Sequence, residues 1–359
     1  MKKAFWKRLY FIIPMSIFLV FLIVLAFVAF TSIAFVSRPN DVDFSSIIRD
    51  NVPLSANVID IAMLGAHNSF SHLIHRSSDI DPNEEPGIAT SFVRHLAPGT
   101  ISRFGRTQVS DAFELLHHGI RYLDVRLTFD DGWYTENTMI SAPFREYAED
   151  VIRFLQANSG ELIIFDLNDV RLGAFATFNQ LWDYMATISI NGQTLFDFVH
   201  ITPYSQPIYE LTLYDATNGG SSAGIIMFAR TATNPADFHY FRDATLRSHW
   251  HEQRNTDGLV ERVAIEHEYL LLGNHDQLLR INQAMISPAL AGSELVNSVL
   301  GWGYLRINER HNAQLAINPN IEDWLGTMPI LKVGFSDSSR GDFNELIIER
   351  INAFNRGLN

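Results

Sequence analysis

The chain has 359 residues, 47% of them hydrophobic, and is long enough to bury the core of one large α/β domain. It contains no cysteine, which excludes disulfide bonds and thiolate metal sites. The net charge is −13, and because the first eight residues contribute +4, the remainder carries −17, which argues against a nucleic-acid partner.

The N-terminal segment has the pattern of a membrane anchor. Four basic residues precede a stretch, residues 9–36, that contains no charged residue. A helix of that length rises about 1.5 Å per residue and would reach roughly 40 Å, more than the roughly 30 Å hydrocarbon core of a bilayer. A cleaved signal peptide typically has a shorter apolar region of about 7 to 15 residues, so an uncleaved anchor is preferred. Cleavage near Ser32 and Ala34 stays open as the alternative.

The basic residues before the span predict that the N-terminus is cytoplasmic and that the main domain is extracytoplasmic, because basic residues tend to stay inside. The expected organisation is a single-pass protein of the cell membrane. Its parts are a cytoplasmic basic N-terminus at residues 1–8, a transmembrane anchor at 9–36, a linker at 37–56 and the main domain at 57–359.

Within the main domain, apolar runs typical of strands alternate with amphipathic helical patterns. Strands are predicted at residues 58–64, 122–127, 162–167, 224–229, 279–285 and 330–335, and helices at 109–118, 144–157, 174–188 and 342–355. This alternation favours parallel strands with crossover helices. A long polar insertion, residues 71–107, separates the first two strands and is expected to lie over the mouth of a barrel.

Polar side chains follow or end the first two strands. His67 and Asn68 come after the first strand, and Asp124 and Arg126 alternate on one face of the second. A histidine can transfer a proton near neutral pH, and an arginine fork can hold a phosphate at two points. The combination indicates phosphodiester chemistry. The alternatives are a hydrogen-bonded turn for His67 and a buried structural ion pair for Arg126, and Arg121 is expected to be structural.

Taken in order, these segments resemble the X domain of phosphatidylinositol-specific phospholipases C, particularly the bacterial ones, in a divergent form. The segments that carry the resemblance are Gly65-Ala66-His67-Asn68-Ser69, Thr107-Gln108, Gly119-Ile120-Arg121-Tyr122-Leu123-Asp124-Val125-Arg126, Ala142-Pro143-Phe144, Glu161-Leu162-Ile163-Ile164-Phe165-Asp166-Leu167, Trp250, Arg280-Ile281-Asn282-Gln283-Ala284-Met285-Ile286-Ser287-Pro288 and Pro329-Ile330-Leu331-Lys332-Val333-Gly334-Phe335.

The resemblance implies a distorted TIM-type (β/α) barrel after the transmembrane helix. It also implies cleavage of a phosphoinositide or glycosyl-phosphatidylinositol, in which the inositol 2-hydroxyl attacks phosphorus and diacylglycerol leaves. By the same resemblance, His67 is the general base, and Asp124 and Arg126 are the acidic and basic residues of the second strand. Arg126 stands where calcium-dependent relatives have a metal-ligating carboxylate, so no metal is expected. Calcium held by Asn68 and Asp124 stays open as an alternative.

Two departures from the family concern the site. The second family histidine is missing from residues 133–139, where Asn137 or Glu136 stands in its place. Asparagine cannot supply a proton, whereas Glu136 can if burial raises its pKa. The aspartate of the last strand is also missing, and Asp337 is expected to orient the histidine base from a shifted position. Asn68, Glu136 and Trp250 are the expected substrate-binding residues.

The sequence thus predicts a membrane-anchored, extracytoplasmic phosphoric diester hydrolase or lyase that acts on phosphatidylinositol-type lipids. Its expected partner is the phospholipid membrane, and no obligate protein partner is inferred. One alternative is a weakened or inactive barrel that binds an inositol phosphate, glycan or lipid headgroup. Another is an enzyme on the same barrel that acts on a non-inositol phosphodiester.

Overall fold

The computed structural model describes residues 43–84, 102, 105–201, 206–231, 239–273, 275–286, 303–334, 336 and 343–358. The predicted membrane anchor, residues 9–36, and the N-terminal residues 1–8 lie outside the described residues. No helix in the part of the chain that the structure describes has both the length and the apolar character needed to cross a membrane.

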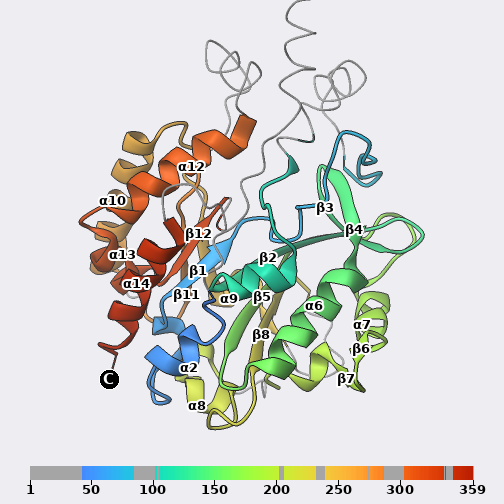
Figure 1. The fold of residues 1–359 in the computed structure, drawn as a ribbon, viewed down its shortest axis with the longest axis horizontal. Coiled ribbons are helices and arrows are strands. Elements are labelled where there is room, and N and C mark those ends of the chain that lie inside the picture. Colours follow the sequence, from blue (N-terminus) through green and yellow to red (C-terminus); the bar gives the residue numbers. More distant parts are fainter. Residues whose placement is uncertain are drawn as a thin grey trace, which may run out of the picture.

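A curved sheet of parallel strands forms the centre of the molecule (Figure 1). Its order is β10-β11-β12-β1-β2-β5-β8-β9, and the antiparallel strands β3 and β4 extend from β2. The strands of this sheet are β1 Met63–Ala66, β2 Ile120–Phe129, β3 Trp133–Asn137, β4 Met139–Pro143, β5 Leu162–Arg171, β8 Gly224–Ala229, β9 Tyr240–Phe241, β10 Leu246–His249, β11 Leu279–Gln283 and β12 Ile330–Val333. A separate hairpin joins β6 Ser189–Ile190 to β7 Gln193–Thr194.

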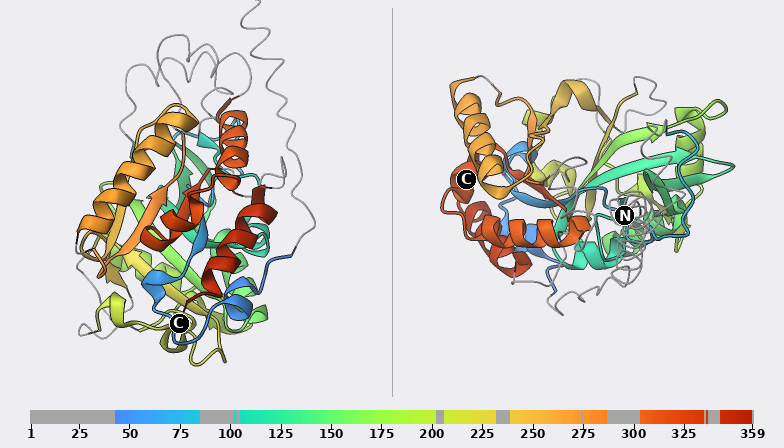
Figure 2. Two further views of the ribbon diagram at one scale, coloured as in Figure 1. Left: turned by 90° about the vertical axis from the view of Figure 1, so that its left-hand side faces the viewer. Right: turned by 90° about the horizontal axis from the view of Figure 1, so that it is seen from above.

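Helices cover the outside of the sheet. In Figure 1 and Figure 2, α10, α12, α13 and α14 gather beside β10, β11, β12 and β1, and α6 lies on the other side of the molecule beside β5. The α-helices are α2 Ile47–Asn51, α5 Ala112–His117, α6 Phe144–Ala157, α7 Phe178–Ala186, α8 Leu213–Ala216, α9 Arg242–Thr245, α10 Thr256–Leu272, α12 Gly303–Ala316, α13 Ile321–Thr327 and α14 Phe343–Asn355. The 3₁₀-helices are η1 Val58–Asp60, η2 Leu195–Asp197 and η3 Ile208–Glu210.

The sheet curls strongly, as one contact across it demonstrates. In the sheet order β10 is three strands away from β1, and in a flat sheet with strands about 4.8 Å apart they would be separated by roughly 14 Å. The ring of Trp250, directly after β10, nevertheless has its centroid 5.8 Å from that of His67, directly after β1. The edge strands β9 and β10 do not pair within the described residues, so the barrel is open and distorted.

The predicted parallel α/β architecture is confirmed, and the first predicted strand needs a local correction. The predicted strand at residues 58–64 is wrong in its first half, because residues 58–60 form η1 and the strand itself begins at Met63. Val58 and Ile59 are as buried as the strand is. A short apolar run therefore predicts burial correctly, but it cannot distinguish a strand from a helical turn.

Part of the predicted linker packs on the barrel. Ile47 and Ile48 of α2 are buried in the main hydrophobic core. The carboxylate of Glu161, at the start of β5, accepts hydrogen bonds from the backbone N–H groups of Ile48 at 3.4 Å and Arg49 at 2.9 Å. This part of the predicted linker therefore packs against the barrel, with Val52 and Ala56 in the same core.

Arg121 lies fully buried at the beginning of β2. Its Nε donates to Glu161 at 2.7 Å, and its remaining donors reach the carbonyl groups of Leu116, Ile120 and Phe44. A buried guanidinium with this many partners is a structural group, as predicted. It ties the N-terminal segment to the end of the barrel opposite to the strand ends that carry His67.

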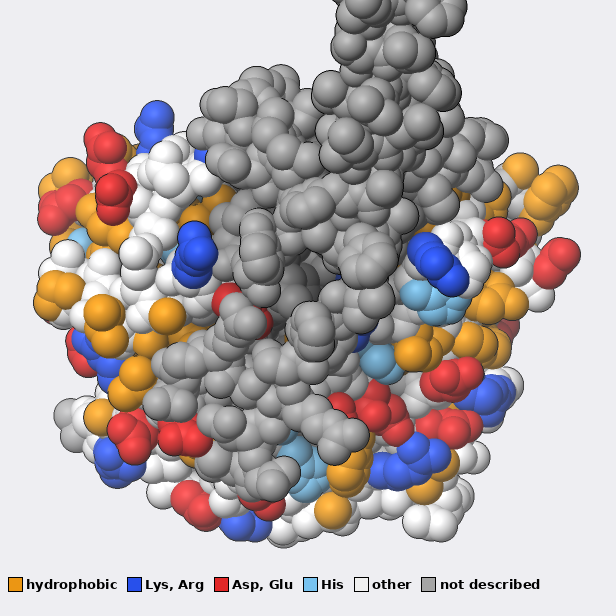
Figure 3. Space-filling view, turned by 45° about the horizontal axis from the view of Figure 1, so that its top comes forward, with side chains coloured by type: hydrophobic (Ala, Val, Ile, Leu, Met, Phe, Trp, Pro, Cys, Tyr) orange, Lys and Arg blue, Asp and Glu red, His pale blue; other side chains and the backbone are white. Residues whose placement is uncertain are grey.

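The carboxyl ends of the strands face the end of the molecule that is shown at the top of Figure 1. Figure 3 tilts this end forward, and acidic, basic and hydrophobic side chains are interspersed on its described surface. In barrels of parallel strands this is the end where active sites lie.

Candidate active site

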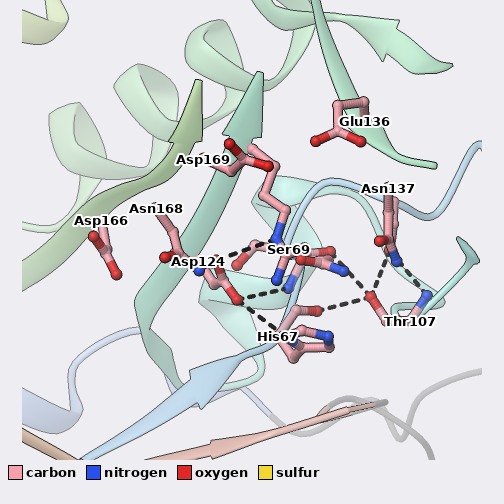
Figure 4. A network of polar contacts seen from close by, with 12 residues as sticks. His67, Ser69, Thr107, Asp124, Glu136, Asn137, Asp166, Asn168 and Asp169 are labelled. Atoms are coloured by element: carbon pink, nitrogen blue, oxygen red, sulfur yellow. Dashed lines mark hydrogen bonds and ion pairs between the residues drawn. The ribbon is translucent and has the colours of Figure 1, made fainter. Parts of the chain in front are cut away.

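His67 occupies the turn that follows β1. Its backbone N–H donates to the carbonyl of Val333 at 2.9 Å, and its carbonyl accepts from Thr107 Oγ1 at 2.8 Å and Gln108 Nε2 at 2.7 Å. The ring Nδ1 lies 3.0 Å from Asp124 Oδ2 (Figure 4). This contact favours the tautomer with the proton on Nδ1, which leaves Nε2 as the basic position of the ring.

Asp124 is the centre of the polar network. Its Oδ2 accepts from His67 and from Lys332 Nζ at 3.1 Å, and its Oδ1 accepts from Asn168 Nδ2 at 2.8 Å. Arg126 Nε is 3.8 Å from the same Oδ1. Burial alone would raise the pKa of Asp124, but the charges of Lys332 and Arg126 and the hydrogen bond from His67 hold it well below its usual value.

These donors also bear on the alternative of a bound calcium ion. Asp124 is one of the two residues considered as ligands, and both of its carboxylate oxygens accept from nitrogen donors, one of them a lysine ammonium. A hard cation needs such oxygens to be free of positive partners. The donor set therefore does not fit a calcium ion. Within the described residues, no group of three or more His, Asp and Glu is arranged to hold a metal ion.

The imidazole of His67 is kept neutral by its surroundings. Its side chain is 6% exposed, and burial lowers the pKa of His67 to about 4, with Arg126 and Lys332 acting in the same direction and Asp124 opposing them. At neutral pH the ring therefore carries no charge and can accept a proton.

Two polar side chains next to His67 and Asp124 have atoms that make no hydrogen bond to the described residues. Neither the amide nitrogen nor the amide oxygen of Asn68 has a hydrogen-bond partner within the described residues, although both are buried. The same holds for Arg126 Nε. Asn68 has a φ of 44°, and this left-handed turn places it directly after the histidine. Buried polar groups are normally paired, so these two side chains are suited to bind a polar ligand.

The hairpin of β3 and β4 carries the next acidic group. Glu136 accepts at Oε2 from the backbone N–H of Thr138 at 3.0 Å and from Arg171 at 3.3 Å. Its Oε1 is buried and has no hydrogen-bond partner in the described part of the chain. Burial raises the pKa of Glu136 to about 7, although Arg171 and Arg126 act against it. Figure 4 shows Glu136 on the side of the site away from His67.

A second charged group lies beside Asp124 on the neighbouring strand. Asp166 accepts from Tyr122 Oη at 2.5 Å and from Arg242 Nε at 2.7 Å. Asp124 and Asp166 are register partners on β2 and β5. Arg242 therefore balances Asp166, and Asp166 is not a second partner for His67.

The structure brings together most of the predicted site residues. His67, Asn68, Asp124 and Arg126 converge around one carboxylate, and Trp250 packs against the His67 ring. The amide of Asn137 is engaged elsewhere, because its Nδ2 donates to the carbonyl of Gly105 at 2.7 Å. Asp337 lies outside the described residues.

Two members of the network are not among the predicted site residues. Lys332 is fully buried within the apolar strand β12, and Asn168 lies where the register between β2 and β5 shifts. A lysine in the middle of an apolar strand is a signal that the sequence does contain. The contact of Asp124 with His67 is the one expected of an aspartate on the last strand.

The chain is similar to known proteins in part of its sequence and in its fold. No family model matches the chain. The chain is 36% identical over 118 residues to a variant-surface-glycoprotein phospholipase C of Trypanosoma brucei brucei, a match that covers 30% of this chain and 33% of that protein. It is 29% identical over 117 residues to PI-PLC X domain-containing protein 3 of Danio rerio, a match that covers 30% of this chain and 36% of that protein. The chain thus spans about a third of the length of these curated relatives.

Solved structures share the fold over nearly the whole domain. The phosphatidylinositol-specific phospholipase C from Listeria monocytogenes superposes with a TM-score of 0.58 at 16% identity, covering 86% of this chain and 99% of that one. A mutant of the phosphatidylinositol-specific phospholipase C from Staphylococcus aureus gives 0.59 at 14% identity, covering 90% and 100%. At these identities the match shows a common fold. Together with the sequence matches, it confirms the resemblance that the motifs predicted.

Proposed function

Because this chain resembles the X domains of phosphatidylinositol-specific phospholipases C in sequence and fold, we propose that it cleaves the phosphodiester of a phosphatidylinositol-type lipid. The observation that carries this proposal is the contact of His67 Nδ1 with Asp124 at 3.0 Å, with Arg126 at 3.8 Å from the same carboxylate. A neutral imidazole and a guanidinium then share one site, and phosphoryl transfer between oxygens needs both a base and a cation.

In the proposed reaction, the Nε2 atom of His67 removes the proton of a headgroup hydroxyl. The oxygen of that hydroxyl forms a bond to phosphorus, and the bond from phosphorus to the glycerol oxygen breaks. The guanidinium of Arg126 stabilises the charge that develops on the phosphate oxygens. Asp124 holds the ring in the required tautomer and stabilises the imidazolium that forms.

The departing glycerol oxygen must receive a proton, and Glu136 is proposed as its donor. This carboxyl group is buried, and its Oε1 has no hydrogen-bond partner among the described residues. The charge of Arg126 acts on its pKa, which places it near the proposed phosphate site. A carboxylic acid can act as a general acid only if it is protonated at the working pH, and burial favours that form here. The amide of Asn137 has no acidic proton to give.

These assignments predict a bell-shaped dependence of kcat/KM on pH. His67 must be unprotonated, so activity rises as the pH increases through about 4, the pKa of His67. Glu136 must be protonated, so activity falls as the pH increases through about 7, the pKa of Glu136. The maximum therefore lies between these two values, and initial rates measured across this range locate both limbs.

The variant Glu136→Gln tests the basic limb directly. It is expected to lose about 10²- to 10⁴-fold in rate and to lose the fall in activity near neutral pH. Glu84→Gln is the matched control, because Glu84 also contacts Arg171, at 3.4 Å, and should keep both the rate and the profile. If Glu136→Gln retained the wild-type profile, another group would be the acid.

The function itself is tested on vesicles that contain phosphatidylinositol. The release of diacylglycerol and of a water-soluble phosphoinositol product is measured in parallel, with phosphatidylcholine vesicles as the control. Turnover of phosphatidylinositol alone supports the proposal. Binding of the vesicles or of inositol phosphate without any turnover would favour the non-catalytic alternative, for which the missing second histidine is the motivating observation.

The uncharged stretch at residues 9–36 supports a membrane tether with the catalytic domain outside the cytoplasm. A tether keeps the domain at the bilayer and raises its effective concentration there. The full chain is reconstituted into phosphatidylinositol vesicles and compared with the chain that lacks residues 1–42. The deletion is expected to lower the rate on the vesicles and to leave the rate on a short-chain soluble substrate unchanged. An equal loss on both substrates would contradict a role confined to tethering.

A further inference from the structure

We propose that Lys332 is a positioning residue of this site, whose ammonium group shares one carboxylate oxygen of Asp124 with His67 and thereby keeps the imidazole uncharged. The inference rests on the proposed function for its consequence in catalysis. The geometry is independent of that function, since Lys332 Nζ and His67 Nδ1 lie 3.1 and 3.0 Å from the same atom, Asp124 Oδ2.

The fold gives the lysine a route to this oxygen. Lys332 lies on β12 and Asp124 on β2, and β1 separates the two strands. The side chain must therefore cross β1, where Gly65 is the register partner of Lys332 and of Tyr122. A Cβ atom at Gly65 would lie only 2.9 Å from Tyr122 Cδ1, so the position beside the lysine leaves no room for a side chain. A glycine is therefore required where the lysine side chain crosses β1, because Tyr122 fills the adjacent space.

The charges around His67 explain why the lysine matters. Among the residues that the structure describes, Asp124 and Arg126 on β2 and Lys332 on β12 are the charged groups with the largest effect on the imidazole. Burial lowers the pKa of Lys332, and the charge of Asp124 opposes that effect. With the lysine in its ammonium form, the three groups carry a net charge of +1, so protonation of His67 would raise the buried cluster to +2. Removing the lysine charge would lower the net charge of the cluster before protonation to zero, so His67 would accept a proton more easily.

The groups on the adjoining elements do not replace Lys332. Asp166 on β5 faces Asp124 but is paired with Arg242 of α9 at 2.7 Å, and Tyr122 donates its hydroxyl to Asp166. The charges of Asp166 and Arg242 therefore cancel each other. Arg126 approaches the opposite oxygen of Asp124, at 3.8 Å. Lys332 is therefore the cation that shares an oxygen with the base.

A merely structural lysine would stabilise Asp124 without changing the ionisation of His67. The test is an NMR titration of the His67 imidazole in histidine-labelled protein, with Lys332→Met compared with Lys332→Arg. The midpoint of His67 is expected to rise by about 1 to 2 pH units in Lys332→Met, since a nearby charge typically shifts a pKa by this amount. Lys332→Arg retains the charge, so the His67 midpoint in this variant should lie close to the wild-type value.

The acid limb of the pH–rate profile should move by the same amount in the same variant. If Lys332→Met does not fold, Lys332→Gln is the second variant, and the same rise is expected because it also lacks the charge. An unchanged His67 midpoint in a folded, uncharged variant would overturn the proposal. A shifted midpoint in a protein that cleaves no phosphodiester would leave the role of Lys332 intact and remove the proposed function instead.

Discussion

Replacing His67 by alanine is expected to lower the turnover of phosphatidylinositol by about 10²- to 10⁴-fold, the usual cost of losing a general base. The fold should persist, because Asp124 keeps its contacts with Lys332 and Asn168 when the imidazole is removed. The measurement is the initial rate on vesicles, combined with thermal unfolding followed by circular dichroism.

A second histidine serves as the control for this change. His117, at the end of α5, is partly exposed and contacts Asp43 at 3.1 Å, and it lies at the opposite end of the strands. His117→Ala should therefore leave the rate unchanged. If His67→Ala kept full activity with an intact fold, the assignment of the base would be wrong and the pocket around Asp124 would have to be given a different role.

The sequence allowed three of the central residues to be predicted for a simple geometric reason. His67 directly follows β1, and Asp124 and Arg126 alternate on one face of the neighbouring strand β2, so their side chains meet at the end of the barrel where β1 ends. The partner of His67 was not predictable in this way. Only the three-dimensional arrangement of β1 and β2 brings Asp124 to the imidazole, and the sequence offered Asp337 as an equally reasonable carboxylate.

Other parts of the fold lack a clear sequence pattern. The helix α10 was not predicted, and it exposes Ile265, Tyr269 and Leu272. Apolar residues on its outer face hide the one-sided periodicity by which a surface helix is recognised. Lys332 presents the opposite problem, because a charged residue in an apolar strand is understood only when its partner across β1 is known.

The two arginines of β2 predict opposite phenotypes, although they are only five positions apart. Arg126→Met is expected to lower kcat by about 10²- to 10³-fold, the typical effect of removing a group that stabilises the transition-state charge. It should change thermal unfolding little, because the guanidinium is 21% exposed and its Nε makes no hydrogen bond to the described residues. Arg121→Met should reduce the free energy of unfolding by about 3 to 5 kcal/mol, since Glu161 would stay buried without its partner.

The two variants control for each other when both rate and stability are measured. Denaturant unfolding gives the stability, and the rate is normalised to the folded fraction. The Arg121 variant should then have a wild-type specific rate, because its ion pair lies at the far end of the barrel from His67. The pattern would be contradicted if Arg126→Met unfolded the domain while its folded fraction stayed fully active, because Arg126 would then be the structural arginine and the phosphate would lack its cation.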